Sequence, residues 1–278
     1  MGSNLARNPF HGRSIAARYA IARPPLHGEA LRVIGSRVPH AARALDLGSG
    51  TGFSTRAALS VADLVVGVDS SADMLRVADR APGTSYVRAV AERLPFTDAV
   101  FDLVTIASAI HWFAPAALAE ARRMVPSDGH LLVYDIWFRA EMTGQPGFHD
   151  WLAQISEERY PPVVKNPRPD LKAIGFASTW KEDLHLPVTM TREALAEYLM
   201  THSERIAAVT ADRETASRAT SHPPRRTDSV LPGCDRSGAR VRRKDGAVRG
   251  PRLRLHVHGL HGREELDRVA PLLPRTAR

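Results

Sequence analysis

Residues 44–52, Ala-Leu-Asp-Leu-Gly-Ser-Gly-Thr-Gly, decide the fold that we predict for this chain. Ala44 and Leu45 end a short apolar run, which is typical of a buried strand, and an alanine-rich segment follows the three glycines. Glycine allows a sharp backbone turn and the close approach of a ligand, so the stretch predicts a strand, a tight turn and a helix. The free N–H groups at the start of that helix favour anionic or polar ligand groups.

The spacing of the glycines distinguishes between classes of nucleotide-binding protein. A dinucleotide fingerprint requires the pattern G-x-G-x-x-G. Gly48 and Gly50 fit its first two positions, but Phe53 stands at the third, and the last glycine is Gly52. A nicotinamide-dependent oxidoreductase is therefore disfavoured.

Length and composition favour one soluble domain, with or without an appendage, because domains mostly have ~50–250 residues and this chain has 278. Its single cysteine excludes an internal disulfide and a multi-cysteine zinc site, and we expect no metal site. No apolar stretch approaches the ~20 residues of a membrane span, and the N-terminal residues lack an apolar signal core. We therefore expect a cytoplasmic location.

The net charge of +8 lies in one part of the chain. Residues 221–278 hold 14 Lys and Arg against 6 Asp and Glu, whereas residues 1–220 are balanced. The body of the protein thus lacks the basic surface typical of nucleic-acid binding, and we expect no nucleic-acid partner.

Apolar runs and helical patterns alternate along the chain. Buried-strand patterns cover 43–47, 64–69, 86–89, 101–107 and 131–138, and helical patterns cover about 53–61, 70–80 and 115–125. This alternation predicts a parallel sheet flanked by helices. Asp69 ends the second strand 21 positions after Gly48, where a carboxylate binds a ribose diol in nucleotide folds.

The pattern D-x-G-x-G-x-G over 46–52, together with Asp69, the Ala91-Glu-Arg-Leu-Pro-Phe96 stretch and the Ser127-Asp-Gly-His130 step, resembles class I S-adenosylmethionine (SAM) dependent methyltransferases. The resemblance is greatest to the small-molecule group (methyltransferase type 11) that includes ubiquinone/menaquinone-type and trans-aconitate-type enzymes. It implies a Rossmann-like α/β fold with a central, mostly parallel sheet. It also implies SAM as cofactor and methylation of O, N or C in a small-molecule acceptor.

Cofactor contacts follow from the same resemblance. They are expected from the glycine loop, the tips of neighbouring strands, the entry helix and the stretch 91–96, which we call the adenine loop: Asp46, Gly48, Ser49, Gly50, Gly52, Asp69, Ser70, Met74, Ala91, Glu92, Ala107, Tyr19 and Arg23. Val90 replaces an acid that is frequent before the adenine loop. Two alternatives remain, namely that Met74 packs in the core, and that Tyr19 packs while Arg23 is solvated.

His111 and Trp112 follow the fourth strand, at the end of the sheet where ligands bind in open α/β folds. We expect both to contact the acceptor. His111 is the candidate general base, although both residues could instead be lid or core contacts. The stretch Ser108-Ala-Ile-His111 lacks the N/D-P-P-Y pattern typical of nucleic-acid methyltransferases, so that class is disfavoured.

The predicted organisation has three parts. Residues 1–40 form a helical cap, residues 41–220 form the SAM-binding domain, and residues 221–278 form an atypical basic tail. Within the domain, residues 139–175 are expected to be a lid that shapes the acceptor pocket. A sixth strand over 180–188 and a helix from Thr191, followed by a polar helix to about 218, complete the domain.

The tail lacks Phe, Trp and Tyr and is rich in arginine, which suggests disorder or a basic arm. A reading-frame slip across 227–246 would also explain its character. An alternative is that Arg252-Leu-Arg-Leu-His-Val-His258, which alternates with period two, supplies the last strand itself. A third alternative is a nucleic-acid-binding arm, but the tail lacks the aromatic residues that stack on bases. An altered tail favours the alternative to methyl transfer, namely that the protein binds SAM with impaired or no catalysis.

Overall fold

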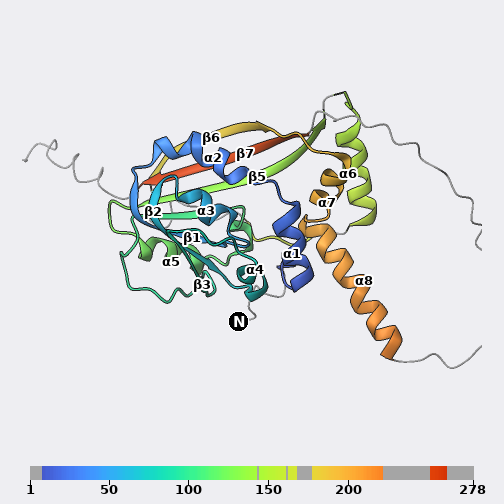
Figure 1. Ribbon diagram of the computed structural model, residues 1–278, viewed down its shortest axis with the longest axis horizontal. Coiled ribbons are helices and arrows are strands. Elements are labelled where there is room, and N and C mark those ends of the chain that lie inside the picture. The colour runs from blue at the N-terminus through green and yellow to red at the C-terminus, as the bar shows by residue number, and fades with distance from the viewer. Residues whose placement is uncertain (1–7, 143, 161, 168–176, 222–250, 262–278) are drawn as a thin grey trace, which may run out of the picture.

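Seven strands form one sheet at the centre of the computed structural model, which describes residues 8–142, 144–160, 162–167, 177–221 and 251–261. The strands are β1 (Ala41–Leu47), β2 (Ala62–Asp69), β3 (Thr84–Arg88), β4 (Leu103–Ala107), β5 (His130–Met142), β6 (Ala177–Pro187) and β7 (Pro251–His261). Their order across the sheet is β3-β2-β1-β4-β5-β7-β6 (Figure 1).

Strands β1 to β5 are parallel, as the sequence predicts. The strand order reverses between β1 and β4, because β2 and β3 lie on one side of β1 while β4 and β5 lie on the other. In an open α/β sheet, a ligand binds beyond the carboxyl ends of the strands at such a reversal. The glycine loop directly follows β1 and so lies at this point.

Strand β7 lies antiparallel between β5 and β6. It contains the alternating stretch Arg252–His258, so this part of the tail is a strand of the sheet, beyond the domain boundary expected at residue 220. Pairing with β7 also accounts for β5 continuing to Met142, past the expected end at 138. The whole segment 227–246 of the frame-slip hypothesis lies outside the described residues, and that hypothesis stays a prediction.

Helices cover both faces of the sheet. On one face, α5 (Ala116–Met124) buries Leu118 and Met124 against strand residues such as Leu45. On the other face, α2 (Leu26–Ile34) and α3 (Phe53–Ala58) pack against a second apolar cluster. The central parallel strands are therefore buried on both sides, which explains their continuous apolar runs.

The helix after β2 is shorter than the sequence suggests. We expected it over 70–80, but α4 spans Ala72–Arg76, with the Ser71 hydroxyl accepting a hydrogen bond from the Met74 N–H at its start. The Asp79 N–H donates to the Thr51 carbonyl at 3.2 Å instead of continuing the helix. The chain therefore turns back toward the glycine loop.

The remaining helices are α1 (Arg13–Ala22), α6 (Phe148–Arg159), α7 (Arg192–Leu199) and α8 (Ser203–Ser221), with short 3-10 turns η2 (Gly35–Arg37) and η3 (Ile110–Trp112). Figure 1 shows α1, α6 and α7 gathered at one end of the sheet, with α8 projecting away. Among the described helices, none is long and apolar enough to cross a membrane.

Candidate active site

The three glycines of the loop all have left-handed backbone conformations, with φ of +75° at Gly48, +53° at Gly50 and +84° at Gly52. A Cβ on Gly48 would lie 2.5 Å from the Ala109 Cβ, and one on Gly52 would collide with the Tyr86 hydroxyl. A Cβ on Gly50 would meet nothing within 4 Å. Gly48 and Gly52 thus serve the packing of the chain, whereas Gly50 faces open space that a ligand can occupy.

Asp46 is completely buried beneath this loop. Its carboxylate accepts hydrogen bonds from the hydroxyls of Ser54 at 2.6 Å, Thr55 at 2.7 Å and Thr105 at 2.9 Å. Burial raises its pKa, and the three hydroxyl donors oppose that rise. Although we expected a cofactor contact, Asp46 does not line the cavity described below and instead ties β1 to α3 and β4.

Asp69 lies at the carboxyl end of β2, beside the glycine loop. One carboxylate oxygen accepts from the Gly50 N–H and the other from the Ser71 N–H, each at 2.8 Å. Burial raises its pKa, and these backbone donors oppose the rise. Ser70 follows, with its carbonyl accepting from the Arg88 side chain at 3.2 Å. The structure thus brings Asp69 and the loop together, as the ribose-binding prediction requires.

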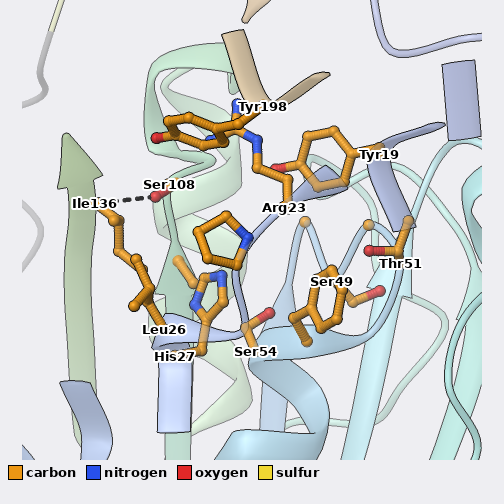
Figure 2. A pocket seen from close by; sticks show the side chains of 15 residues that line it. Tyr19, Arg23, Leu26, His27, Ser49, Thr51, Ser54, Ser108, Ile136 and Tyr198 are labelled. Atoms are coloured by element: carbon orange, nitrogen blue, oxygen red, sulfur yellow. Dashed lines mark hydrogen bonds between the residues drawn. The ribbon is translucent and has the colours of Figure 1, made fainter. Parts of the chain in front are cut away.

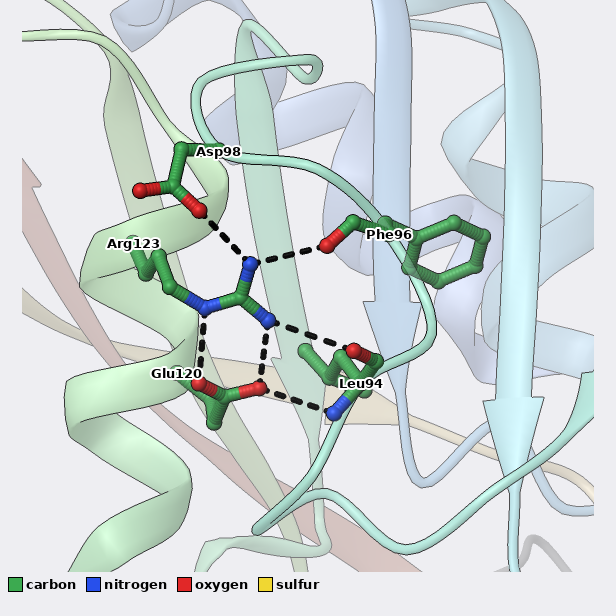
Figure 3. A network of polar contacts seen from close by, with 5 residues as sticks. All are labelled: Leu94, Phe96, Asp98, Glu120 and Arg123. Carbon is green, nitrogen blue, oxygen red and sulfur yellow. Dashed lines mark hydrogen bonds and ion pairs between the residues drawn. The ribbon is translucent and has the colours of Figure 1, made fainter.

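Arg123 of α5 holds the adenine loop in place (Figure 3). Its guanidinium donates to the carbonyls of Leu94 and Phe96, at 3.2 and 2.8 Å, and pairs with Glu120 and Asp98. Glu120 also accepts from the Leu94 N–H at 2.8 Å. Hydrogen bonding to these acids raises the pKa of Arg123, and the same pairing lowers the pKa of Glu120.

Three other expected cofactor contacts have different surroundings. Ala91 is buried, and Glu92 accepts a hydrogen bond from the Ala114 N–H at 2.8 Å. Met74 is only 2% exposed and does not line the cavity, which fits the core-packing alternative. Adenine contacts from these residues stay a prediction.

A cavity lies between the glycine loop, the carboxyl end of β4 and a roof formed from α1 and α7 (Figure 2). Its described lining is Tyr19, Arg23, Pro24, Leu26, His27, Gly48, Ser49, Gly50, Thr51, Phe53, Ser54, Ala107, Ser108, Ile136 and Tyr198. It therefore joins four expected site residues, Gly48, Ser49 and Gly50 of the loop and Ala107 of β4, to Tyr19 and Arg23. The cavity measures about 50 Å³, less than the ~300–1,000 Å³ that is usual for ligand pockets.

Three polar atoms at this cavity are buried without a hydrogen-bond partner among the described residues: Ser49 Oγ, Thr51 Oγ1 and Arg23 Nε. Leaving a buried polar group unpaired costs about 1–3 kcal/mol. The side chains of Ser49 and Thr51 are 4% and 3% exposed, so bulk water does not satisfy them. A polar ligand at the loop would satisfy them.

Arg23 and two tyrosines form the roof. The guanidinium lies 4.8 Å from the Tyr19 ring centre and 5.1 Å from that of Tyr198, and it donates to the Thr201 carbonyl at 3.0 Å. Figure 2 shows Arg23 between the two rings. The prediction that Tyr19 and Arg23 cap the pocket agrees with this position, but Tyr198 gave no signal in the sequence.

His27 and Ser108 are further lining residues that sequence reasoning did not select. The His27 ring lies 3.0 Å from the Tyr134 hydroxyl, and burial together with the charge of Arg23 lowers its pKa to about 4. Ser108 has a left-handed φ of +52°, and its hydroxyl accepts from the Ile136 N–H. A non-glycine residue in that conformation after β4 marks a sharp turn at the ligand end of the sheet.

His111 and Trp112, the predicted acceptor residues, lie on η3 and do not line this cavity. The Nδ1 of His111 is 3.9 Å from an oxygen of the buried Asp135. The Asn166 backbone N–H donates to the His111 carbonyl at 2.9 Å, and the Trp112 ring packs edge-on against Phe10. Their contact with an acceptor, and the lid role of 139–175, stay predictions; residues 168–175 of that lid lie outside the described residues.

In the described part of the chain, no group of three or more His, Cys, Asp or Glu side chains is arranged to hold a metal ion. The site is thus built from a glycine loop, an acid at the tip of β2 and a cavity beyond β4. Together with the strand order, these features define the class I methyltransferase fold.

Comparison with known proteins supports this class. The methyltransferase domain family matches residues 45–133. A Dictyostelium discoideum protein named as a methyltransferase is 23% identical over 197 residues, which cover 66% of this chain and 73% of that protein. The malonyl-[acyl-carrier protein] O-methyltransferase of Geobacter sulfurreducens is 36% identical over 135 residues, which cover 44% of this chain and 49% of that enzyme. The match thus spans about half of the Geobacter enzyme.

A solved structure agrees at the level of the fold. The protein described as a type II methyltransferase from Anaeromyxobacter dehalogenans superposes with a TM-score of 0.53 and 21% identity, over 85% of this chain and 95% of that one. Residues 45–133 thus match the methyltransferase domain family, and the chain has the Rossmann-like fold of the class I SAM-dependent methyltransferases.

Proposed function

We propose that this chain transfers a methyl group from SAM to a small-molecule acceptor at the cavity beside the glycine loop. The observation that carries the proposal is the pair of buried, unpartnered hydroxyls of Ser49 and Thr51, on either side of Gly50 and its open space. Such a polar cradle at the reversal of strand order fits a cofactor with hydroxyl, amino and carboxylate groups.

The residues of this chain fit the parts of that cofactor. Asp69 accepts hydroxyl hydrogen bonds, as a ribose requires, and the backbone of the adenine loop supplies polar groups for the base. SAM supplies the methyl group on a positively charged sulfur. The chain itself needs to orient the acceptor toward that methyl group and to exclude water, which the roof over the cavity favours.

The class of acceptor and the methylated atom belong to the proposal. The Geobacter relative is named as an O-methyltransferase, which is compatible with an oxygen acceptor here. The balanced charge of residues 1–220 favours a small molecule over a nucleic acid. A cytoplasmic location also stays a prediction.

General-base catalysis by His111 applies only to an acceptor that carries a proton to lose. The test is His111→Ala, with SAM affinity measured beside turnover. Loss of turnover with unchanged affinity supports the role, and unchanged turnover removes it. His40→Ala, which changes an exposed histidine just before β1, is the matched control.

The second candidate function is SAM binding with impaired or no catalysis, which the basic composition of residues 221–278 favours. Labelled-methyl transfer from SAM separates the two candidates. We expect labelled product with at least one member of a panel of small acids, phenols and quinone precursors. SAM binding without label in any of them favours the non-catalytic protein, and label in RNA or DNA alone contradicts a small-molecule acceptor.

A further inference from the structure

We propose that Asp135 of β5 is a positioning residue for His111, the candidate general base, and that the two side chains act as a pair when the acceptor loses its proton. This inference rests on the proposed methyl transfer. It adds a residue to that reaction and limits the acceptor to one that carries a proton on the methylated atom. Its basis is the way in which the chain fixes a buried carboxylate beside the imidazole ring.

Asp135 and His111 differ in their exposure and lie close together. Asp135 is only 3% exposed, whereas the side chain of His111 is 22% exposed. One carboxylate oxygen of Asp135 lies 3.9 Å from Nδ1 of His111, so this contact is electrostatic rather than a hydrogen bond. A carboxylate at that distance favours the protonated ring. The pair therefore becomes attractive when His111 accepts a proton.

The backbone on both sides of Asp135 is joined to the turn that carries His111. The Ser108 N–H donates to the Tyr134 carbonyl at 2.8 Å, and the Ile136 N–H donates to the Ser108 hydroxyl at 3.0 Å. Ser108 stands three positions before His111 in the chain. The separation between the carboxylate and the ring is therefore set by backbone hydrogen bonds on either side of Asp135.

The other end of the turn is held as well. The Asn166 N–H donates to the His111 carbonyl at 2.9 Å, and the side-chain amide of Asn166 donates to the Phe113 carbonyl at 2.8 Å. Phe113 lies beside the glycine loop, because a Cβ on Gly48 would be 3.1 Å from its ring. His111 thus belongs to a fixed turn next to the loop at which we propose that SAM binds.

Two further elements bring charged or titratable groups near the pair. Lys165 has its Nζ 5.9 Å from the ring centre of the neighbouring Trp112, and it pairs with Glu204 at 3.5 Å. His256 of β7 stands opposite Asp135 in the register of the sheet. Since directly paired residues of neighbouring strands share a face, the effect of His256 has to be tested separately.

The chemistry gives each member of the pair one task. As a hydroxyl acceptor forms its bond to the methyl carbon, its proton passes to Nε2 of His111, and the carbon–sulfur electron pair stays on sulfur. The acceptor becomes a neutral methyl ether, the sulfonium becomes a neutral thioether, and the positive charge moves to the imidazolium ring. The carboxylate of Asp135 stabilises that charge. On the neutral ring it favours the proton at Nδ1, so that Nε2 carries the lone pair.

The first test follows the ring of His111 by NMR through a pH titration of the full chain, with its signal assigned by its loss in His111→Gln. In Asp135→Asn, we expect the midpoint of this titration to fall by about one pH unit or more, with SAM affinity unchanged. The same fall is expected in a His256→Gln background, because it does not pass through His256. Asp63→Asn removes an exposed carboxylate that pairs with another histidine, and it should leave the midpoint unchanged.

The second test is labelled-methyl transfer from SAM to the phenol of the panel that is labelled fastest. A fluorinated analogue of that phenol, already ionised at neutral pH, is the matched acceptor, since it has no proton to lose. In Asp135→Asn, we expect kcat for the phenol to fall roughly tenfold or more and KM to stay the same. The kcat for the ionised analogue should change little.

Three results overturn the inference. The first is an equal His111 midpoint in the wild type and in folded Asp135→Asn. The second is an equal fall of kcat for both phenols, which would assign Asp135 a structural role. The third is label in no phenol of the panel; label in small acids then leaves the proposed methyl transfer standing.

Thermal melting checks that Asp135→Asn is folded. If it is not, the wild-type protein decides, because pairing with the carboxylate requires a His111 midpoint above about 6.5, the ordinary value for histidine. A lower midpoint overturns the pairing. Failure of the proposed function is seen separately, as the absence of SAM binding, and the NMR titration then still decides whether Asp135 and His111 form a pair.

Discussion

Asp69 at the tip of β2 accepts a 2.8 Å hydrogen bond from the backbone N–H of Gly50, at the middle of the glycine loop. The same carboxylate accepts from the Ser71 N–H with its other oxygen. One side chain thus connects the predicted ribose site to the loop with the unpartnered hydroxyls. We therefore expect cofactor binding and loop geometry to be coupled through Asp69.

Replacing Asp69 with asparagine should weaken SAM binding and loosen the glycine loop. The amide keeps one acceptor oxygen and places an NH₂ group against one of the two backbone donors. We expect SAM affinity to fall at least tenfold, since each lost hydrogen bond to a charged group is worth about 1.5–3 kcal/mol. Calorimetry measures the effect. Asp63→Asn, at an exposed aspartate, is the control, and equal affinities in all three proteins would contradict the role of Asp69.

Two glycine substitutions should separate folding from binding. Alanine at Gly50 adds a Cβ in open space, so only its left-handed conformation is unfavourable, by about 1–2 kcal/mol. Alanine at Gly48 adds a collision with Ala109, which raises the cost to about 3 kcal/mol. We expect Gly50→Ala to lose SAM binding while remaining folded. Urea unfolding and calorimetry test this, and normal SAM affinity in Gly50→Ala would be the contrary outcome.

Arg123→Ala should loosen the adenine loop. Without the guanidinium, the carbonyls of Leu94 and Phe96 lose their donor, and Glu120 loses the partner that holds it against the Leu94 N–H. We expect hydrogen exchange at the Leu94 amide to accelerate at least tenfold and SAM affinity to fall. Arg80→Ala, beside Tyr86, is the control. Unchanged exchange at Leu94 would show that other contacts hold the loop.

Protonation of His27 should make the free energy of unfolding depend on pH. Its pKa is about 4 in the folded protein against 6.5 for the free side chain, so between these values the unfolded chain binds more protons. Stability therefore falls as the pH falls from 6.5 to 4, by about 3 kcal/mol for this group. His202, whose pKa is lowered to about 3, adds to the same trend.

His27→Gln should remove that contribution. Between pH 6.5 and 4, urea unfolding should show wild-type protein losing about 3 kcal/mol more than the variant. The contributions of His202 and of the buried acids cancel in this difference. His40→Gln changes an exposed histidine and should follow the wild type. If the free energy of unfolding changed equally with pH in the wild type and in His27→Gln, the burial of His27 in neutral form would be contradicted.

The features predicted correctly from the sequence are local in the chain. The parallel strands follow from apolar runs, and the position of Asp69 beside the loop follows from two neighbouring strands that end at the same edge of the sheet. The length of α4 could not be predicted, because it is set by a hydrogen bond from Asp79 to Thr51 in the glycine loop.

The roof of the cavity could not be predicted because its residues come from distant parts of the chain. Tyr198 lies 175 positions after Arg23, and neither residue stands in a periodic pattern that links them. No sequence pattern singles out His27, and only the fold places it against Tyr134. The motif predicts a ligand contact for Asp46, but not the three hydroxyls of the core that its oxygens bind, and the ligand contact stays a prediction.

The central claim, that the glycine loop and its unpartnered hydroxyls form a SAM site, is tested most directly by calorimetric titration of the full chain with SAM. We predict saturable binding at one site per chain, at least tenfold weaker in the double variant Ser49→Ala, Thr51→Val. The hydroxyls are buried without partners, so these substitutions should leave the thermal melting temperature unchanged or higher. Absence of SAM binding by the folded wild-type chain would contradict the claim.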